Sequence, residues 1–243
     1  MFAPEPGGTG SYLHYLLAGL GWTLATALAA WAIALVIGSV IGTLRTTPIV
    51  PVVRLGNAYV EIFRNVPLIV QMFLWFFVMP ELLPKAMGDW IKQVPPPWGS
   101  YIPAVLCLGI YTSVRIAEQV KSGINSLARG QRMAGTALGL TQAQAYRYVV
   151  LPQAFRIILP PLTSEFMNVI KNSSVALTIG LLELTGRARA MQEFSFKVFE
   201  AFAAATVIYL LTNLVVVLGM RTLEKKVRVP GLVVAGGAPT AGH

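Results

Sequence analysis

The chain has 243 residues, of which 55% are apolar and only 12% are charged, and its formal net charge is +9. Soluble domains are about 45–50% apolar and about 25% charged, so this chain has too few polar side chains to cover a soluble globule. The same hydrophobicity excludes an intrinsically disordered chain. The composition therefore indicates a membrane protein.

The cysteine and histidine content excludes a disulfide-stabilised protein and argues against a metal-binding one. Cys107 is the single cysteine, so the chain forms no internal disulfide framework. The two histidines, His14 and His243, lie near opposite ends, so we expect no metal site. The net positive charge does not require nucleic acid as a partner, because membrane proteins collect Lys and Arg on their cytoplasmic side.

A membrane span needs about 20 mostly apolar residues. This criterion predicts an all-α polytopic protein, a single transmembrane domain over residues 1–243. Its five spans are expected at about 18–44, 59–83, 101–121, 154–182 and 200–221. Gly38 and Gly42 lie four residues apart in the first span. They either allow a neighbouring helix to pack closely or are glycines that a membrane helix tolerates without such a role.

The distribution of Lys and Arg predicts the orientation. Residues 1–21 contain neither, whereas residues 121–156 hold five basic residues and no acid. Basic loops stay inside, so we expect the N-terminus outside and the C-terminus inside. Residues 183–200 are balanced in charge and are expected outside, and residues 229–243 are expected to form a flexible tail.

The inside loop, residues 128–153, has its own helix signals. A short helix is expected before Gly139, which suits the left-handed turn at a helix end. Thr141 and Gln144 fit a capping box at the start of a second helix, which Pro152 is expected to end. A helix, a glycine turn and a helix also begin DNA-reading elements, but here both ends are tethered to spans.

This loop resembles the loop of permease subunits in binding-protein-dependent ABC importers. The family pattern has Glu-Ala-Ala, three residues, Gly, nine residues, Ile, one residue and Leu-Pro. Met133 and Gly135 depart from Glu and Ala, and Val149 replaces Ile conservatively; the matching positions are Ala134, Gly139, Leu151 and Pro152. Residues 58–77, 151–180 and 223–231 also resemble the polar amino-acid branch of this family, especially its glutamate and aspartate permeases.

The resemblance implies a division of labour between subunits. The loop, through Ala134, Gly135, Gly139, Leu151 and Pro152, would dock on a pair of ATPase subunits that bind ATP and Mg. This chain has no Gly-x-x-x-x-Gly-Lys-Ser/Thr phosphate loop, so we expect it to bind no cofactor and to be no enzyme. The other implied partners are a second permease (a copy or a relative), an external amino-acid-binding protein and lipid of a bacterial inner membrane, with no nucleic acid.

Ionisable side chains inside spans cost roughly 2.5–3.5 kcal/mol each on insertion scales, so they mark candidate functional positions. The candidate substrate path consists of Arg115, Glu118, Glu165, Lys171, Asn172 and Ser173. Two structural interpretations stay open: Arg115 and Glu118, three residues apart on one helix face, neutralise one another, or Lys171 only packs or reaches toward the membrane surface.

The resemblance also bears on the substrate. Related permeases often carry a small or neutral residue in place of Arg115, and many carry Asp in place of Asn172. An added positive charge and a removed negative one favour an acidic amino acid, because a guanidinium group suits a carboxylate. The alternative is an ion-coupled secondary transporter or channel that uses Glu118, Glu165 and Lys171, although five spans are few for such a carrier. A membrane enzyme is the third interpretation, and no nucleophile–base pair supports it.

Overall fold

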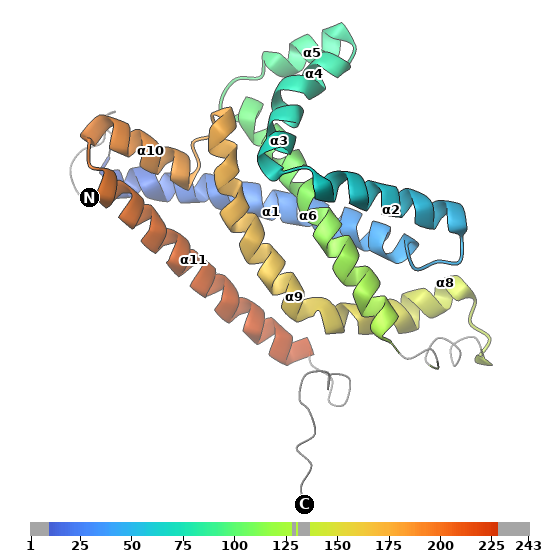
Figure 1. Ribbon diagram of the computed structural model, residues 1–243. Coiled ribbons are helices and arrows are strands. Elements are labelled where there is room, and N and C mark those ends of the chain that lie inside the picture. Colours follow the sequence, from blue (N-terminus) through green and yellow to red (C-terminus); the bar gives the residue numbers. More distant parts are fainter. Residues whose placement is uncertain (1–9, 128–129, 131–136, 228–243) are drawn as a thin grey trace, which may run out of the picture.

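The computed structural model describes residues 10–127, 130 and 137–227, and these residues form helices joined by short turns (Figure 1). The expected all-α fold class is therefore confirmed. The helices are α1 (Tyr12–Leu44), α2 (Val50–Asn65), α3 (Leu68–Phe73), η1 (Leu74–Val78), α4 (Met79–Leu82), α5 (Lys85–Lys92), α6 (Trp98–Ser126), α8 (Gln142–Ala145), η2 (Tyr146–Val150), α9 (Leu151–Asn172), η3 (Ser173–Ile179), α10 (Leu184–Ser195) and α11 (Val198–Val227).

Three of the described helices, α1, α6 and α11, are long and apolar enough to cross a membrane. A fourth crossing exists if α2 and the helix over Leu68–Leu82 together form one bent span. Helix α9 is too polar to meet the same criterion, since it carries Arg156, Glu165 and Lys171. The count of five spans and the outside N-terminus remain predictions, and the expected tail at 229–243 lies outside the described residues.

The second expected span, 59–83, contains a sharp break. Helix α2 ends at Asn65, Val66 is extended, and the chain turns by 100° before the helix resumes at Leu68. Pro67 disfavours helical backbone at the preceding residue and supplies no amide hydrogen. The Gln71 side-chain amide donates to the free carbonyls of Phe63 at 2.8 Å and Val66 at 2.9 Å, which stabilises the bend.

Helices α1 and α6 pack along much of their lengths, and small residues on α1 allow the close approach. A Cβ atom added to Gly38 would lie 2.6 Å from the carbonyl oxygen of Ser113, and one added to Gly42 would lie 2.7 Å from that of Ala117. Both distances are shorter than any normal contact. The two glycines therefore allow α6 to pack closely against α1, and they are not merely tolerated in the helix.

Helix α9 contains two consecutive prolines, Pro160 and Pro161, and neither of them ends the helix. It continues through both prolines to Asn172, and only there does the backbone tighten into the 3₁₀ helix η3. Ile158 and Leu162, on either side of the prolines, are buried in one apolar cluster with Ile116 and Val120 of α6. This tertiary packing maintains the helix where its own hydrogen bonds are lost.

A buried carboxylate joins three helices at the other end of the molecule. Glu183 has no exposed surface and caps α10, accepting from the backbone amides of Thr185 at 2.9 Å and Gly186 at 2.8 Å. Its carboxylate also accepts from the hydroxyls of Thr23 on α1 and Tyr209 on α11. These bonds set the position of α10 against both long helices.

The close contact between α1 and α6 predicts that substitutions at Gly38 and Gly21, both in α1, have different effects on stability. Gly38→Ala should lower the apparent melting temperature in detergent, because overpacking a tight contact costs about 1–3 kcal/mol. Gly21→Ala, where an added Cβ meets nothing within 4 Å, should leave it unchanged. Equal melting temperatures for the two variants would contradict the packing described here.

Candidate functional site

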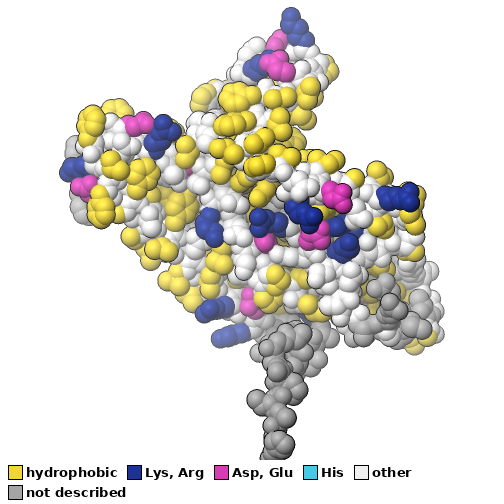
Figure 2. Space-filling model, viewed as in Figure 1, with side chains coloured by type: hydrophobic (Ala, Val, Ile, Leu, Met, Phe, Trp, Pro, Cys, Tyr) yellow, Lys and Arg dark blue, Asp and Glu magenta, His cyan; other side chains and the backbone are white. Residues whose placement is uncertain are grey.

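Helices α6 and α9 bring a basic and an acidic candidate together. Arg115 Nη1 of α6 lies 3.8 Å from Glu165 Oε1 of α9. The Arg115 side chain is 48% exposed and that of Glu165 is 12% exposed. On the face drawn in Figure 2, basic and acidic side chains gather in a band that crosses α9, α6 and α2 as Figure 1 places them.

Local helix geometry orients the Arg115 side chain. Tyr111 lies one turn before it, and residues four apart share a helix face. Arg115 Nη2 is 3.4 Å from the Tyr111 hydroxyl, and the guanidinium carbon is 5.6 Å from the centre of the Tyr111 ring. Tyrosine thus supports one side of the guanidinium group, through a weak hydrogen bond and a cation–π contact, while the other side stays accessible.

The remaining polar candidates lie where α9 becomes η3. Lys171 is exposed and its ammonium group has no ion-pair or hydrogen-bond partner among the described residues, and Asn172 is half-buried. Ser173 is buried, and its hydroxyl donates to the carbonyl of Ile170 at 2.8 Å. Lys171 and Asn172 are therefore open to a bound molecule, whereas Ser173 is bonded to its own helix.

Glu118 does not join this group. Its Oε1 accepts from Arg45 Nη2 at 2.9 Å and lies 3.9 Å from Arg64 Nη1. Although Arg115 and Glu118 are close along α6, they pair with different elements, so they do not neutralise one another. The sequence spacing gave no signal for Arg45, because it lies 73 positions before Glu118.

The loop expected to dock on an ATPase is described in part, since Ala134 and Gly135 lie outside the described residues. Gly139 has φ of +82°, as a left-handed turn requires. The predicted capping box is present, with Thr141 N donating to Gln144 Oε1 at 2.9 Å and Gln144 N donating to Thr141 Oγ1 at 3.3 Å.

The predicted helix end at Pro152 is wrong. Leu151 and Pro152 open α9, and the chain stays helical from α8 through η2 into α9. Helix η2 is a π turn, whose wider spacing accommodates a proline that lacks an amide hydrogen. The loop is thus continuous with α9, the helix that carries Glu165 and Lys171.

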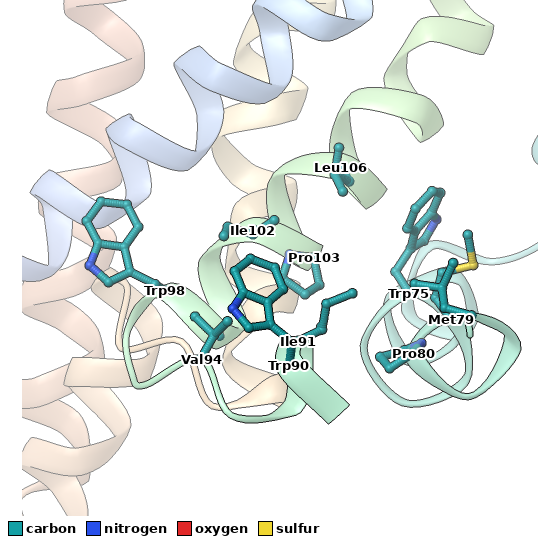
Figure 3. Close-up of a pocket in the computed structure, with 12 residues that line it drawn as sticks. Trp75, Met79, Pro80, Trp90, Ile91, Val94, Trp98, Ile102, Pro103 and Leu106 are labelled. Carbon is teal, nitrogen blue, oxygen red and sulfur yellow. The ribbon is translucent and has the colours of Figure 1, made fainter. Parts of the chain in front are cut away.

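An apolar cavity of about 360 Å³ lies apart from these residues (Figure 3). It is enclosed by η1, α4, α5 and the start of α6, and three tryptophans, Trp75, Trp90 and Trp98, line it. None of the polar candidates lines this cavity. A cavity of this composition does not suit a zwitterionic solute, so the candidate site remains the polar face of α6 and α9.

Comparisons with known proteins agree with this arrangement. The family described as "Binding-protein-dependent transport system inner membrane component" matches residues 34–229. The glutamate/aspartate import permease protein GltJ of Escherichia coli (strain K12) is 47% identical over 93% of this chain and 92% of its own length. The glutamine transport system permease protein GlnP of the same strain is 32% identical over 88% of this chain and 93% of its own length.

Two solved structures share the fold. A crystal structure of an amino acid ABC transporter with histidines superposes with a TM-score of 0.74 at 29% identity, covering 88% of this chain and 95% of that chain. An inward-facing structure of the MetNI methionine ABC transporter gives a TM-score of 0.73 at 18% identity, covering 89% and 98%. The chain therefore belongs to the family of inner membrane components of binding-protein-dependent ABC importers, as a permease subunit and not an enzyme.

Proposed function

We propose that the chain is the permease subunit of an importer for acidic amino acids, glutamate and aspartate in particular. The printed name of the Escherichia coli relative supports this substrate class. The half-exposed guanidinium of Arg115 is the single observation that carries the proposal. Family membership argues against the alternative of an ion-coupled carrier or channel.

The geometry leaves Arg115 able to bind a carboxylate. Its 3.8 Å separation from Glu165 exceeds the 2.7–3.2 Å of an N–H···O hydrogen bond, so the pair is held by charge and the guanidinium donors stay available. A guanidinium group can donate two parallel hydrogen bonds to one carboxylate. Arg115 is therefore suited to bind the side-chain carboxylate of glutamate or aspartate.

The charge balance of the face favours an anion. Arg115 and Lys171 contribute two positive charges and Glu165 one negative charge, which leaves one net positive charge. Glu118 adds nothing to this balance, because Arg45 neutralises it elsewhere. An acidic amino acid near pH 7 carries one net negative charge, which matches this face.

Glu165 has a role that is compatible with the same substrate. Its Oε2 atom is buried and has no hydrogen-bond partner among the described residues. The side chain as a whole is 12% exposed beside Arg115, and a carboxylate accepts the hydrogen bonds that an ammonium group donates. We assign the α-ammonium group of the substrate to Glu165, and we place Lys171 and Asn172 beside the path, with Ser173 supporting the helix behind them.

The exposed charges also require partners. Arg115 and Lys171 on a face open to lipid would cost roughly 2.5–3.5 kcal/mol each, so a second permease, a copy or a relative, is proposed to cover this face. An external binding protein would deliver the substrate. The ATPase pair, which would hold ATP and Mg, is proposed to dock on residues 128–153 through Ala134, Gly135, Gly139, Leu151 and Pro152, so that this chain itself holds no cofactor.

Removing the guanidinium group tests the substrate assignment. Arg115→Gln, in the complete transporter in vesicles, should reduce uptake of radiolabelled glutamate by about 10- to 100-fold, the loss expected for a hydrogen-bonded charge pair. Arg189→Gln, which breaks an exposed ion pair with Glu193 on α10, should have no such effect. Normal uptake by Arg115→Gln, or loss of the assembled complex, would contradict the substrate role.

The turn at Gly139 tests the docking assignment. Gly139→Val should abolish ATP-dependent uptake, because a β-branched residue does not tolerate a φ of +82°. Gly139→Asn should retain most uptake, since Asn accepts the left-handed conformation. Recovery of the ATPase subunit with each purified variant is the second readout, and full activity of Gly139→Val would overturn the assignment.

A further inference from the structure

The end of α1 that is expected inside is held to two other helices by one buried side chain. The side chain of Arg45 is 5% exposed, and its Nε donates to Asn57 Oδ1 of α2 at 2.8 Å. Its Nη2 donates to Glu118 Oε1 of α6 at 2.9 Å. One guanidinium group thus binds three helices, α1, α2 and α6, at a single point.

The backbone of α2 closes tightly on this side chain. A Cβ added to Gly56 would lie 2.6 Å from Arg45 Cγ, so α2 can approach only because Gly56 has no side chain. The Arg45 side chain is buried and the Glu118 side chain is 39% exposed, so removing Glu118 would leave a buried positive charge without its partner. The three helices therefore move together at this point, and a force on α1 is passed to α2 and α6.

Thr46, the residue after Arg45, contacts the segment proposed to dock on the ATPase. The hydroxyl of Tyr146, the first residue of η2, donates to the Thr46 carbonyl at 2.8 Å and lies 3.3 Å from the Thr46 hydroxyl. Thr46 directly follows Arg45. The ring of Tyr146 is 7% exposed and belongs to the apolar cluster that includes Ile116 of α6.

Movement of the segment proposed to dock on the ATPase could reach the other helices in two ways, along the backbone or through the Tyr146–Thr46 hydrogen bond. Helix α9 follows η2 directly along the chain, so it needs no side-chain contact to move with the loop. Helices α1 and α2 are far from the loop in sequence and need a bond across space. A hydrogen bond is directional and resists sliding, whereas the packing of the Tyr146 ring does not fix its position in the same way.

We propose that Tyr146, Thr46, Arg45 and Glu118 form a coupling relay, which passes the displacement of the ATPase-docking segment to α1, α2 and α6. The relay rests on the proposed function, in which an ATPase docks on residues 128–153. Tyr146 and Glu118 are positioning residues in this mechanism. Neither is assigned to bind the substrate or ATP.

The test measures solute uptake and ATP hydrolysis on the same sample of the complete transporter, with its ATPase and binding protein, in vesicles. Radiolabelled glutamate is the probe. Tyr146→Phe keeps the ring and deletes the hydroxyl, so the complex should assemble and hydrolyse ATP, while glutamate imported per ATP falls about fivefold, as for the loss of one hydrogen bond. Glu118→Gln, which leaves the Arg45 charge unneutralised, should lower the same ratio.

Two control variants match these changes. Tyr101→Phe also deletes a hydroxyl that donates to a carbonyl of α1, that of Ala25 at 3.3 Å, but lies far from the docking segment along the chain. Glu193→Gln removes an exposed carboxylate paired with Arg189 on α10. Both controls should retain the wild-type ratio of glutamate to ATP.

The outcomes separate the relay from the proposed function. A wild-type ratio in both Tyr146→Phe and Glu118→Gln overturns the relay, and so does a parallel fall of uptake and hydrolysis at constant ratio. If the unmodified chain does not recover an ATPase subunit or does not import glutamate, the proposed function fails instead. A lowered ratio with normal recovery of the ATPase supports the relay.

Discussion

An ionised side chain in a hydrocarbon layer must either find a partner or face water, and this constraint organises the polar residues of the chain. At the end of α1 that is expected inside, Arg45 is paired with Glu118 and almost fully buried. Near the middle of the polar face, Arg115 is only loosely paired with Glu165 and half-exposed. The Arg45 guanidinium is enclosed and links helices, whereas the Arg115 guanidinium retains free donors and is suited to a ligand.

The same constraint applies to the backbone wherever a helix is interrupted. At Pro67 the side chain of Gln71 binds two carbonyls that the break leaves free. Beyond η3, Glu183 satisfies the first amides of α10. Before Pro152, the π turn η2 keeps the chain helical, so the segment proposed to dock on the ATPase is continuous with α9 and its polar face. At Pro67 and at the start of α10 the free backbone groups are thus satisfied internally, as a low-dielectric environment requires.

Features with local causes could be predicted from the sequence. The helical fold follows from composition and from the length of the apolar runs, the capping box from Thr141 and Gln144, and the left-handed turn from Gly139. The resemblance of the loop and of two longer segments indicated the family that the comparisons establish. The sequence marks Arg115 and Glu165 as candidates because a charge inside a span is costly, but it carries no sign of their contact.

Features with distant causes could not be predicted. The pairing of Glu118 is one of them, because Arg45 lies 73 positions away and nothing in the spacing along α6 points to it. Glu183 was overlooked, since a carboxylate in a charge-balanced loop gives no sign that Thr23 and Tyr209 will bury it. The continuity of α9 through Pro160-Pro161 depends on packing against α6, which the proline rule does not include.

The partners of the chain test the account most directly. The tagged chain should be purified gently from its own membrane, and its stoichiometric partners should be identified by mass spectrometry. The account predicts an ATPase subunit together with a second permease, a copy or a relative, and ATP-dependent uptake after reconstitution with the binding protein. A chain recovered alone that imports solute without ATP would contradict it, and the charged residues of α6 and α9 would then have to be interpreted as an ion pathway.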